Sequence, residues 1–172
     1  ISGDLPKALE DDDILFLDED GRYMLLEFPS DDVPAYSQDM IFKVMQRGIT
    51  PIIVHPERNN RILKKPTILQ NLIKQGCLVQ ITASSYVGTF GKDIEEMSRK
   101  FIEAGQCACF ASDAHDLPKR QYEYSEALEK LSDEFGSEKA QEFRDNAQAI
   151  VNGDDVPLDW RPLKKKKKFW LF

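Results

Sequence analysis

Short apolar runs that end in polar residues recur along this chain. Residues 51–54 are apolar and mostly β-branched, and they lead directly into His55. Residues 107–111 form another run, which leads into Ser112-Asp-Ala-His115. A buried parallel strand has this composition because both its faces are covered, and the first polar residue after it lies at the mouth of the sheet. The chain has only two histidines, and each follows a predicted strand.

Another pair of apolar runs comes earlier in the chain. Residues 14–17 and 23–26 are joined by residues 18–22, which contain an Asp-Gly pair. Such a pair between two apolar runs is a strong turn signal, so a hairpin is predicted here. The second of these runs is followed by Glu27, so a third predicted strand ends in a polar residue.

Segments with helical spacing separate the runs. Asp31 or Asp32 is the predicted cap of a helix that ends at Gly48, and Ser137 is the predicted cap of the last helix. Residues 77–82 are a further predicted strand, and residues 83–91 a predicted loop. The other helices are predicted over residues 4–10, on either side of Pro66 with the second part at 67–75, and over residues 93–104, 122–131 and 137–151. This alternation predicts an α/β fold with a parallel sheet, and polar groups at several strand ends are typical of an α/β barrel.

Four strand-end residues are candidate metal ligands: Glu27, His55, Asp113 and His115. Carboxylate and imidazole groups together suit a divalent ion such as Mn, Fe or Zn. Asp113 and His115 are two positions apart, so on extended backbone they share a face. Taken singly, each residue is better explained as a hydrogen-bonded histidine or a solvated carboxylate than as a ligand, and it is their coincidence at three strand ends that favours a metal site.

Two arginines are candidates for holding an anion, because guanidinium groups fit phosphate oxygens in a bidentate way. Arg58 lies three residues after His55, and Arg120 lies five residues after His115. An ordinary surface position is the alternative for both. The cysteines do not support a cysteine phosphatase, which needs an arginine six residues after its cysteine. Those positions here hold Ala83, Asp113 and His115, and no glycine-rich phosphate loop is present either.

Composition fits a soluble protein of one domain, with 41% hydrophobic and 31% charged residues in 172. Three cysteines without paired spacing favour a reducing compartment, and we expect a cytoplasmic location. The net charge of −7 makes general nucleic-acid binding a poor prospect.

The chain, which is acidic elsewhere, ends in a basic tail of five lysines followed by residues 169–172, which include aromatic side chains. Its lysines are Lys164, Lys165, Lys166, Lys167 and Lys168. The tail is either a solvated charged segment or an anchor at the inner face of the membrane, where each lysine would contribute about 1 kcal/mol near anionic lipid.

Several segments together resemble one family. They are Leu25-Leu-Glu-Phe-Pro29, Val54-His-Pro-Glu-Arg-Asn59, Gln80-Ile-Thr82 with Gly88-x-Phe-Gly91, and Ala111-Ser-Asp-Ala-His115. The chain is similar to the bacterial tyrosine-protein phosphatases of the polymerase-and-histidinol-phosphatase (PHP) superfamily, from capsule and exopolysaccharide clusters, and most of all to the Bacillus form.

The resemblance implies a distorted TIM-like barrel with a trinuclear metal site, usually supported by Mn²⁺. Glu27 and His55 would bind one metal, Asp113 a second and His115 a third. Arg58 and Arg120 would hold the phosphoryl group. The implied reaction is hydrolysis of phosphotyrosine on a bacterial tyrosine kinase that controls polysaccharide synthesis, by a metal-activated water and without a covalent cysteine intermediate.

The family's opening Asp-x-His-x-His, its Pro-His-His segment and a bridging Glu have no counterpart here. We therefore expect residues 1–163 to be the carboxy-terminal part, about two thirds, of one PHP barrel domain, with residues 164–172 as a separate tail. Such a fragment alone is expected to be inactive. Two alternatives stay open: a related PHP phosphoesterase acting on a small phosphate monoester, and a binding module that has lost catalysis.

Overall fold

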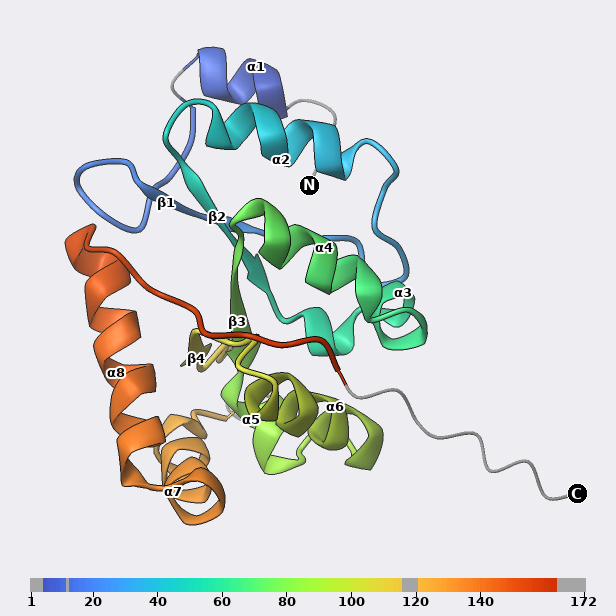
Figure 1. Cartoon of the computed structure of the whole chain (residues 1–172), viewed down its shortest axis with the longest axis vertical. Coiled ribbons are helices and arrows are strands. Elements are labelled where there is room, and N and C mark those ends of the chain that lie inside the picture. The colour runs from blue at the N-terminus through green and yellow to red at the C-terminus, as the bar shows by residue number, and fades with distance from the viewer. Residues whose placement is uncertain (1–4, 12, 116–120, 164–172) are drawn as a thin grey trace, which may run out of the picture.

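A four-stranded parallel sheet organises the chain, as the sequence predicts (Figure 1). The computed structural model describes residues 5–11, 13–115 and 121–163. The strands are β1 (Tyr23–Leu26), β2 (Thr50–Val54), β3 (Leu78–Thr82) and β4 (Cys109–Ala111). They lie side by side in chain order, and every neighbouring pair is parallel. Within the described ranges β1 and β4 are open edges, so these four strands do not close into a barrel.

Helices connect the strands and cover the sheet. They are α1 (Leu5–Glu10), α2 (Ser37–Met45), α3 (Asn60–Lys64), α4 (Thr67–Gln75), α5 (Ala83–Val87), α6 (Lys92–Glu103), α7 (Tyr124–Phe135) and α8 (Ser137–Asn152), with a 3₁₀ turn η1 (Pro56–Arg58). Crossovers between parallel strands are right-handed, so strands that follow one another in chain order carry their helices on the same face. This topology leaves the opposite face of the sheet for α8 and for the site.

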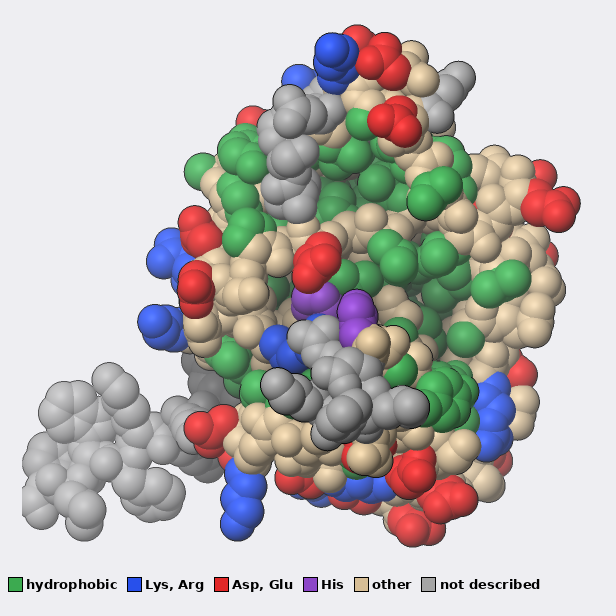
Figure 2. All heavy atoms as spheres, turned by 180° about the vertical axis from the view of Figure 1, so that it is seen from behind, with side chains coloured by type: hydrophobic (Ala, Val, Ile, Leu, Met, Phe, Trp, Pro, Cys, Tyr) green, Lys and Arg blue, Asp and Glu red, His purple; other side chains and the backbone are tan. Residues whose placement is uncertain are grey.

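The two faces of the sheet have different neighbours. Leu26, Ile53, Val79 and Phe110 point to one face and belong to the main core, which also contains buried apolar residues of helices α2 to α8. The opposite face carries a smaller cluster of Tyr23, Ile52, Leu78 and Cys109, which Ile150 of α8 covers. Toward the strand ends this face is hollowed and partly open, with Leu25 46% exposed. Figure 2 shows the hollow, with hydrophobic side chains in it and both histidines at its lower edge.

Two predictions in the N-terminal part are wrong. Residues 14–17 are not a strand: one hydrogen bond from Leu17 N to Tyr23 O joins the two runs, and Leu15 is 94% exposed. The turn is formed instead by the Asp18 carboxylate, which accepts from the backbone N–H groups of Arg22 and Tyr23. Helix α2 begins at Ser37, several residues after Asp31 and Asp32, so neither caps it.

Further boundaries differ from prediction, and α7 ends at Phe135 rather than at residue 131. Residues 83–87 form α5 where a loop is predicted, and this short helix is held by the burial of Tyr86 and its neighbours. Helix α8 is preceded by Gly136, so Ser137 is its first residue and not its cap. Strand β4 is shorter than residues 107–111, although Cys107 is buried with the rest of that run. Residues 153–163 have no regular structure, and Arg161 N donates to Ala104 O. No helix in the described part of the chain has the length and apolar character needed to cross a bilayer.

Candidate active site

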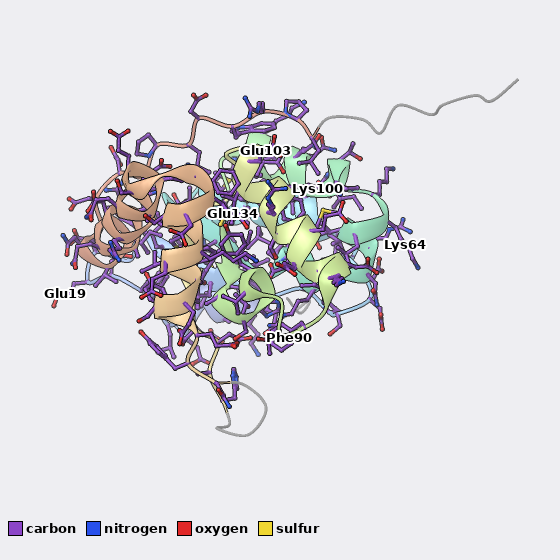
Figure 3. All side chains as sticks on the ribbon, turned by 90° about the horizontal axis from the view of Figure 1, so that it is seen from below. Glu19, Lys64, Phe90, Lys100, Glu103 and Glu134 are labelled. Atoms are coloured by element: carbon purple, nitrogen blue, oxygen red, sulfur yellow. The ribbon has the colours of Figure 1, made fainter. Side chains whose placement is uncertain are left out.

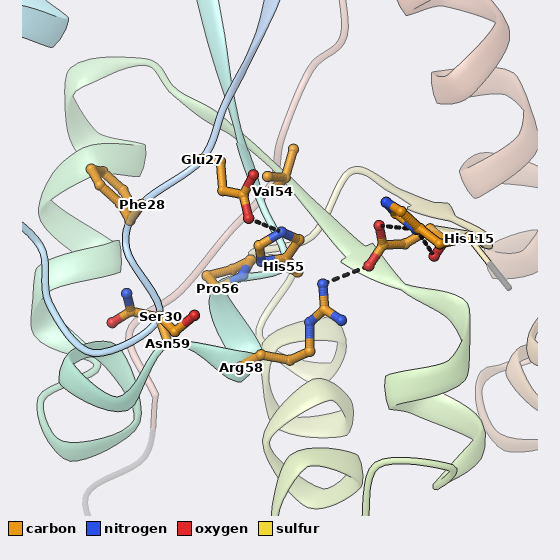
Figure 4. A pocket seen from close by; sticks show the side chains of 10 residues that line it. Glu27, Phe28, Ser30, Val54, His55, Pro56, Arg58, Asn59 and His115 are labelled. Carbon is orange, nitrogen blue, oxygen red and sulfur yellow. Dashed lines mark hydrogen bonds and ion pairs between the residues drawn. The ribbon is translucent and has the colours of Figure 1, made fainter. Parts of the chain in front are cut away.

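One pocket of about 300 Å³ lies at the C-terminal ends of the strands (Figure 4). It brings together five predicted site residues: Glu27, His55, Arg58, Asp113 and His115. Arg120, the sixth, lies outside the described residues. Phe28, Ser30, Val54, Pro56 and Asn59 complete the lining.

The strand register explains why residues so distant in sequence meet. Glu27 directly follows β1, His55 directly follows β2, and Asp113 comes two residues after β4. The ends of neighbouring parallel strands lie at the same edge of a sheet, so the residues that follow them share one location. The sequence prediction of this shared location is therefore consistent with the topology.

The four candidate ligands stand as two pairs. Nε2 of His55 lies 3.0 Å from Oε1 of Glu27, whose side chain is 67% exposed. Nδ1 of His115 lies 2.7 Å from the backbone oxygen of Asp113 and 3.4 Å from its carboxylate. A carbonyl oxygen can only accept, so Nδ1 of His115 carries the proton. In the neutral ring Nε2 is then the basic nitrogen, which is the arrangement of a histidine oriented for metal binding.

Arg58 connects to the second pair. Its guanidinium donates to Oδ2 of Asp113 across 2.6 Å, and both side chains are less than one fifth exposed. The guanidinium carbon also lies 5.3 Å from the centroid of the Phe90 ring. An arginine fixed in this way offers a pre-oriented set of N–H donors to an anion in the pocket.

Backbone strain coincides with the candidate ligands. His55 has φ 38° and Asp113 has φ 49°, and no other non-glycine residue in the described ranges has a positive φ. This region costs most residues about 1–2 kcal/mol, and such strain concentrates at functional sites. Burial, and next the nearby Arg58 charge, lower the pKa of His55. The imidazole is therefore neutral near pH 7, which is the form that binds metals.

Buried polar groups hold the turn that carries His55 and Arg58. Glu57 is fully buried, and its carboxylate accepts from the backbone N–H of Thr82 at the end of β3. Burial raises the pKa of Glu57 to about 7, opposed by the polar groups of Ser85 and Thr82. On the other side, the Asn59 side chain donates to Pro29 O and accepts from Ile62 N, so it joins the turn to the β1–α2 loop and caps α3.

The donor set fits a divalent metal in part. Two imidazoles and two carboxylates are the right chemistry, and one ring is already oriented by its backbone contact. In the described ranges, however, no three His, Cys, Asp or Glu side chains converge closely enough to form a complete site by themselves. These residues are thus candidates for only part of a coordination shell.

Three residues that support this site have no role predicted from the sequence: Glu57, Asn59 and Phe90. All three lie in segments that carry the family resemblance, and that was the one available signal. Their contacts join positions about 25 to 30 residues apart or more, so no local pattern predicts them.

Comparison with known proteins defines the class. Residues 1–152 match the family described as "Capsular polysaccharide synthesis, CpsB/CapC". The tyrosine-protein phosphatase YwqE of Bacillus subtilis is 35% identical over 173 residues, covering 100% of this chain and 68% of YwqE. The tyrosine-protein phosphatase CpsB of Streptococcus pneumoniae is 29% identical, covering 77% of this chain and 57% of CpsB.

A solved structure agrees with these matches. The YwqE crystal structure, whose description calls YwqE and CpsB metal-dependent tyrosine phosphatases, superposes with a TM-score of 0.91 at 35% identity. It covers 96% of this chain, and the chain covers 67% of it. The chain therefore belongs to the CpsB/CapC family. It spans about two thirds of YwqE and less than two thirds of CpsB.

Proposed function

We propose that this chain contributes the strand-end half of the active site of a metal-dependent phosphotyrosine phosphatase in capsular polysaccharide synthesis. The main support for this proposal is that one pocket at the ends of three parallel strands is lined by Glu27, His55, Arg58, Asp113 and His115. The phosphatases YwqE and CpsB are its relatives, and its fold matches that of YwqE.

In this proposal the two pairs bind metal, with Mn²⁺ as the expected ion. Glu27 and His55 would hold one ion, and Asp113 and His115 would contribute to others. A bound divalent metal would lower the pKa of an attacking water and provide positive charge near the phosphoryl oxygens. Arg58 orients the phosphoryl group and stabilises negative charge on its oxygens, and Arg120 is the second arginine proposed for this task. The three thiols are buried, so no cysteine nucleophile is needed or offered.

The proposed fold is part of a PHP-type barrel formed by residues 1–163. Consecutive parallel strands with their crossover helices on one face, and a hollow lined by Leu25 on the other, are the arrangement of a barrel segment. The relatives are longer than the region they share with this chain. We propose that the complete barrel and the remaining ligands include polypeptide beyond these 172 residues.

The proposed substrate is phosphotyrosine on a tyrosine kinase that controls polysaccharide assembly. Residues 164–172, outside the described ranges, would bring the enzyme to the cytoplasmic face of the membrane through their lysines. Removing residues 164–172 should abolish sedimentation with vesicles containing phosphatidylserine, while vesicles of neutral lipid bind neither form. Equal sedimentation of both forms would exclude this role of the tail.

The test of the activity is phosphate release from a phosphotyrosine peptide by chelated protein, with and without added Mn²⁺. Release only after Mn²⁺ addition, and slower release from histidinol phosphate, would support the proposal. Faster release from the small monoester would favour the related phosphoesterase. Absence of release with both substrates at saturating metal would mean that this chain alone has no phosphatase activity.

A further inference from the structure

The guanidinium of Arg58 is held from two directions. Its edge donates to Oδ2 of Asp113, and its carbon lies 5.3 Å from the centroid of the Phe90 ring. The Arg58 side chain is 17% exposed, so the contact with Phe90 is largely shielded from solvent. A cation this close to an aromatic face is attracted by the negative charge density of the ring.

The backbone around Phe90 fixes where its ring lies. Phe90 is in the turn between α5 and α6, flanked by Gly88 and Gly91, which both have positive φ. Thr89 N donates to Ser84 O, and the Thr89 hydroxyl lies 2.8 Å from both carboxylate oxygens of Glu123. Figure 3 shows Phe90 at the end of α6 opposite Lys100 and Glu103. The turn is thus attached both to α5 and to the segment that precedes α7.

The two contacts of Arg58 would respond differently to an anion that binds in the pocket. Asp113 accepts from Nη2 of Arg58, so a phosphate that bound to the same nitrogen would compete with the carboxylate. The ring of Phe90 contacts the guanidinium without accepting from those N–H groups. The ring of Phe90 can therefore stay in contact with the Arg58 guanidinium while the hydrogen bonds of the guanidinium change partner from Asp113 to the ligand.

We propose that Phe90 is a positioning residue for Arg58: its ring sets the orientation in which the guanidinium receives the phosphoryl group. This inference rests on the proposed phosphatase function only for its effect on the reaction. The contact itself can be measured without turnover.

Two substitutions separate the aromatic face from simple packing. Phe90→Leu keeps an apolar side chain and removes the ring, whereas Phe90→Tyr keeps the ring. We expect Phe90→Leu to raise KM for a phosphotyrosine peptide about two- to fivefold with little change in kcat, which corresponds to one cation–π contact. Phe90→Tyr should match the unsubstituted protein, and so should Phe42→Leu at an exposed position of α2.

The matching physical measurement is the Nε–H signal of Arg58 in ¹H–¹⁵N NMR spectra of the full chain, assigned by its loss in Arg58→Lys. The ring current of Phe90 should shift this signal, so it should move in Phe90→Leu and stay in Phe90→Tyr. An unmoved signal in Phe90→Leu, or equal kinetic effects of both substitutions, would overturn the inference. If the protein with the complete barrel releases no phosphate, the proposed function fails, and the NMR signal of this chain still decides whether Phe90 positions Arg58.

Discussion

His55 and Asp113 share a left-handed backbone conformation at the ends of β2 and β4. Their φ angles are 38° and 49°, and they are the only non-glycine residues in the described ranges with positive φ. Each also holds a partner in the pocket, Glu27 for His55 and Arg58 for Asp113. The two strained positions therefore coincide with the His55–Glu27 contact and the Arg58–Asp113 ion pair, as expected where side chains are placed for function at a cost in stability.

Because the backbone at His55 is strained, a glycine variant there should be more stable than an alanine variant, which is the reverse of the usual order. His55→Gly should have a free energy of unfolding about 1 kcal/mol higher than His55→Ala, because glycine adopts positive φ without a steric penalty. The exposed Lys74 in α4 is the control, and there alanine should be the more stable by about 1 kcal/mol. Urea unfolding of the four variants measures both differences. If the alanine variant has the higher free energy of unfolding at both positions, His55 is not strained.

The position of Arg58 predicts that lysine cannot replace it. Arg58→Lys keeps the charge but loses the paired N–H donors, so kcat/KM for a phosphotyrosine peptide should fall about 10- to 100-fold. Arg61→Lys is the matched control, since Arg61 is 58% exposed and its contact with Asp32 is 3.9 Å long. Steady-state kinetics of both variants decides the matter. A similar loss in both, or in neither, would contradict the role given to Arg58.

Burial of Glu57 predicts a dependence of stability on pH. Its pKa rises from 4.5 to about 7 on folding, so between these values the folded chain binds more protons than the unfolded chain. The free energy of unfolding should therefore fall as pH rises from 4.5 to 7, by on the order of 3 kcal/mol, and then level off. Glu57→Gln should remove this part of the dependence. Denaturant unfolding of both proteins at several pH values, with metal chelated, measures this dependence. If the free energy of unfolding changes with pH in the same way in both proteins, Glu57 is not its cause.

The cysteines are expected to be inert in the folded protein. All three are buried, and burial raises the pKa of Cys77 and of Cys109 to about 12 and also raises the pKa of Cys107. A thiol-specific disulfide reagent at pH 8 should modify none of them until denaturant is added, and then all three. Rapid reaction of one thiol in the folded state would reopen the question of a cysteine nucleophile.

The sequence predicted those elements that strong local signals mark. Strand β2 ends at Val54, as predicted, because a β-branched run ends there against His55 and Pro56. Helix α4 also has its predicted bounds, since Pro66 precedes it and Gly76 ends it in the left-handed conformation. The parallel order of the sheet followed from the alternation of strands and helices.

Elements whose stability depends on distant contacts were not predictable. Residues 14–17 are apolar, but they pair with β1 through little more than the Leu17–Tyr23 contact. Helix α5 has a sequence of low helical propensity, and burial of its side chains against α6 and α7 stabilises it. In the site, the common location of the strand-end residues was predictable. The Arg58–Asp113 and Arg58–Phe90 contacts were not, because they depend on side-chain packing between separate connections.

If the strand-end residues bind a divalent metal, Mn²⁺ titration of the chelated protein, followed by electron paramagnetic resonance, will detect that binding. The unsubstituted protein should bind Mn²⁺, and His55→Gln and Glu27→Gln should each weaken binding at least about tenfold. Glu138→Gln, at an exposed position of α8, should leave binding unchanged. Mn²⁺ binding that is equal in all four proteins, or absent from all of them, would contradict the assignment of this pocket as a metal site.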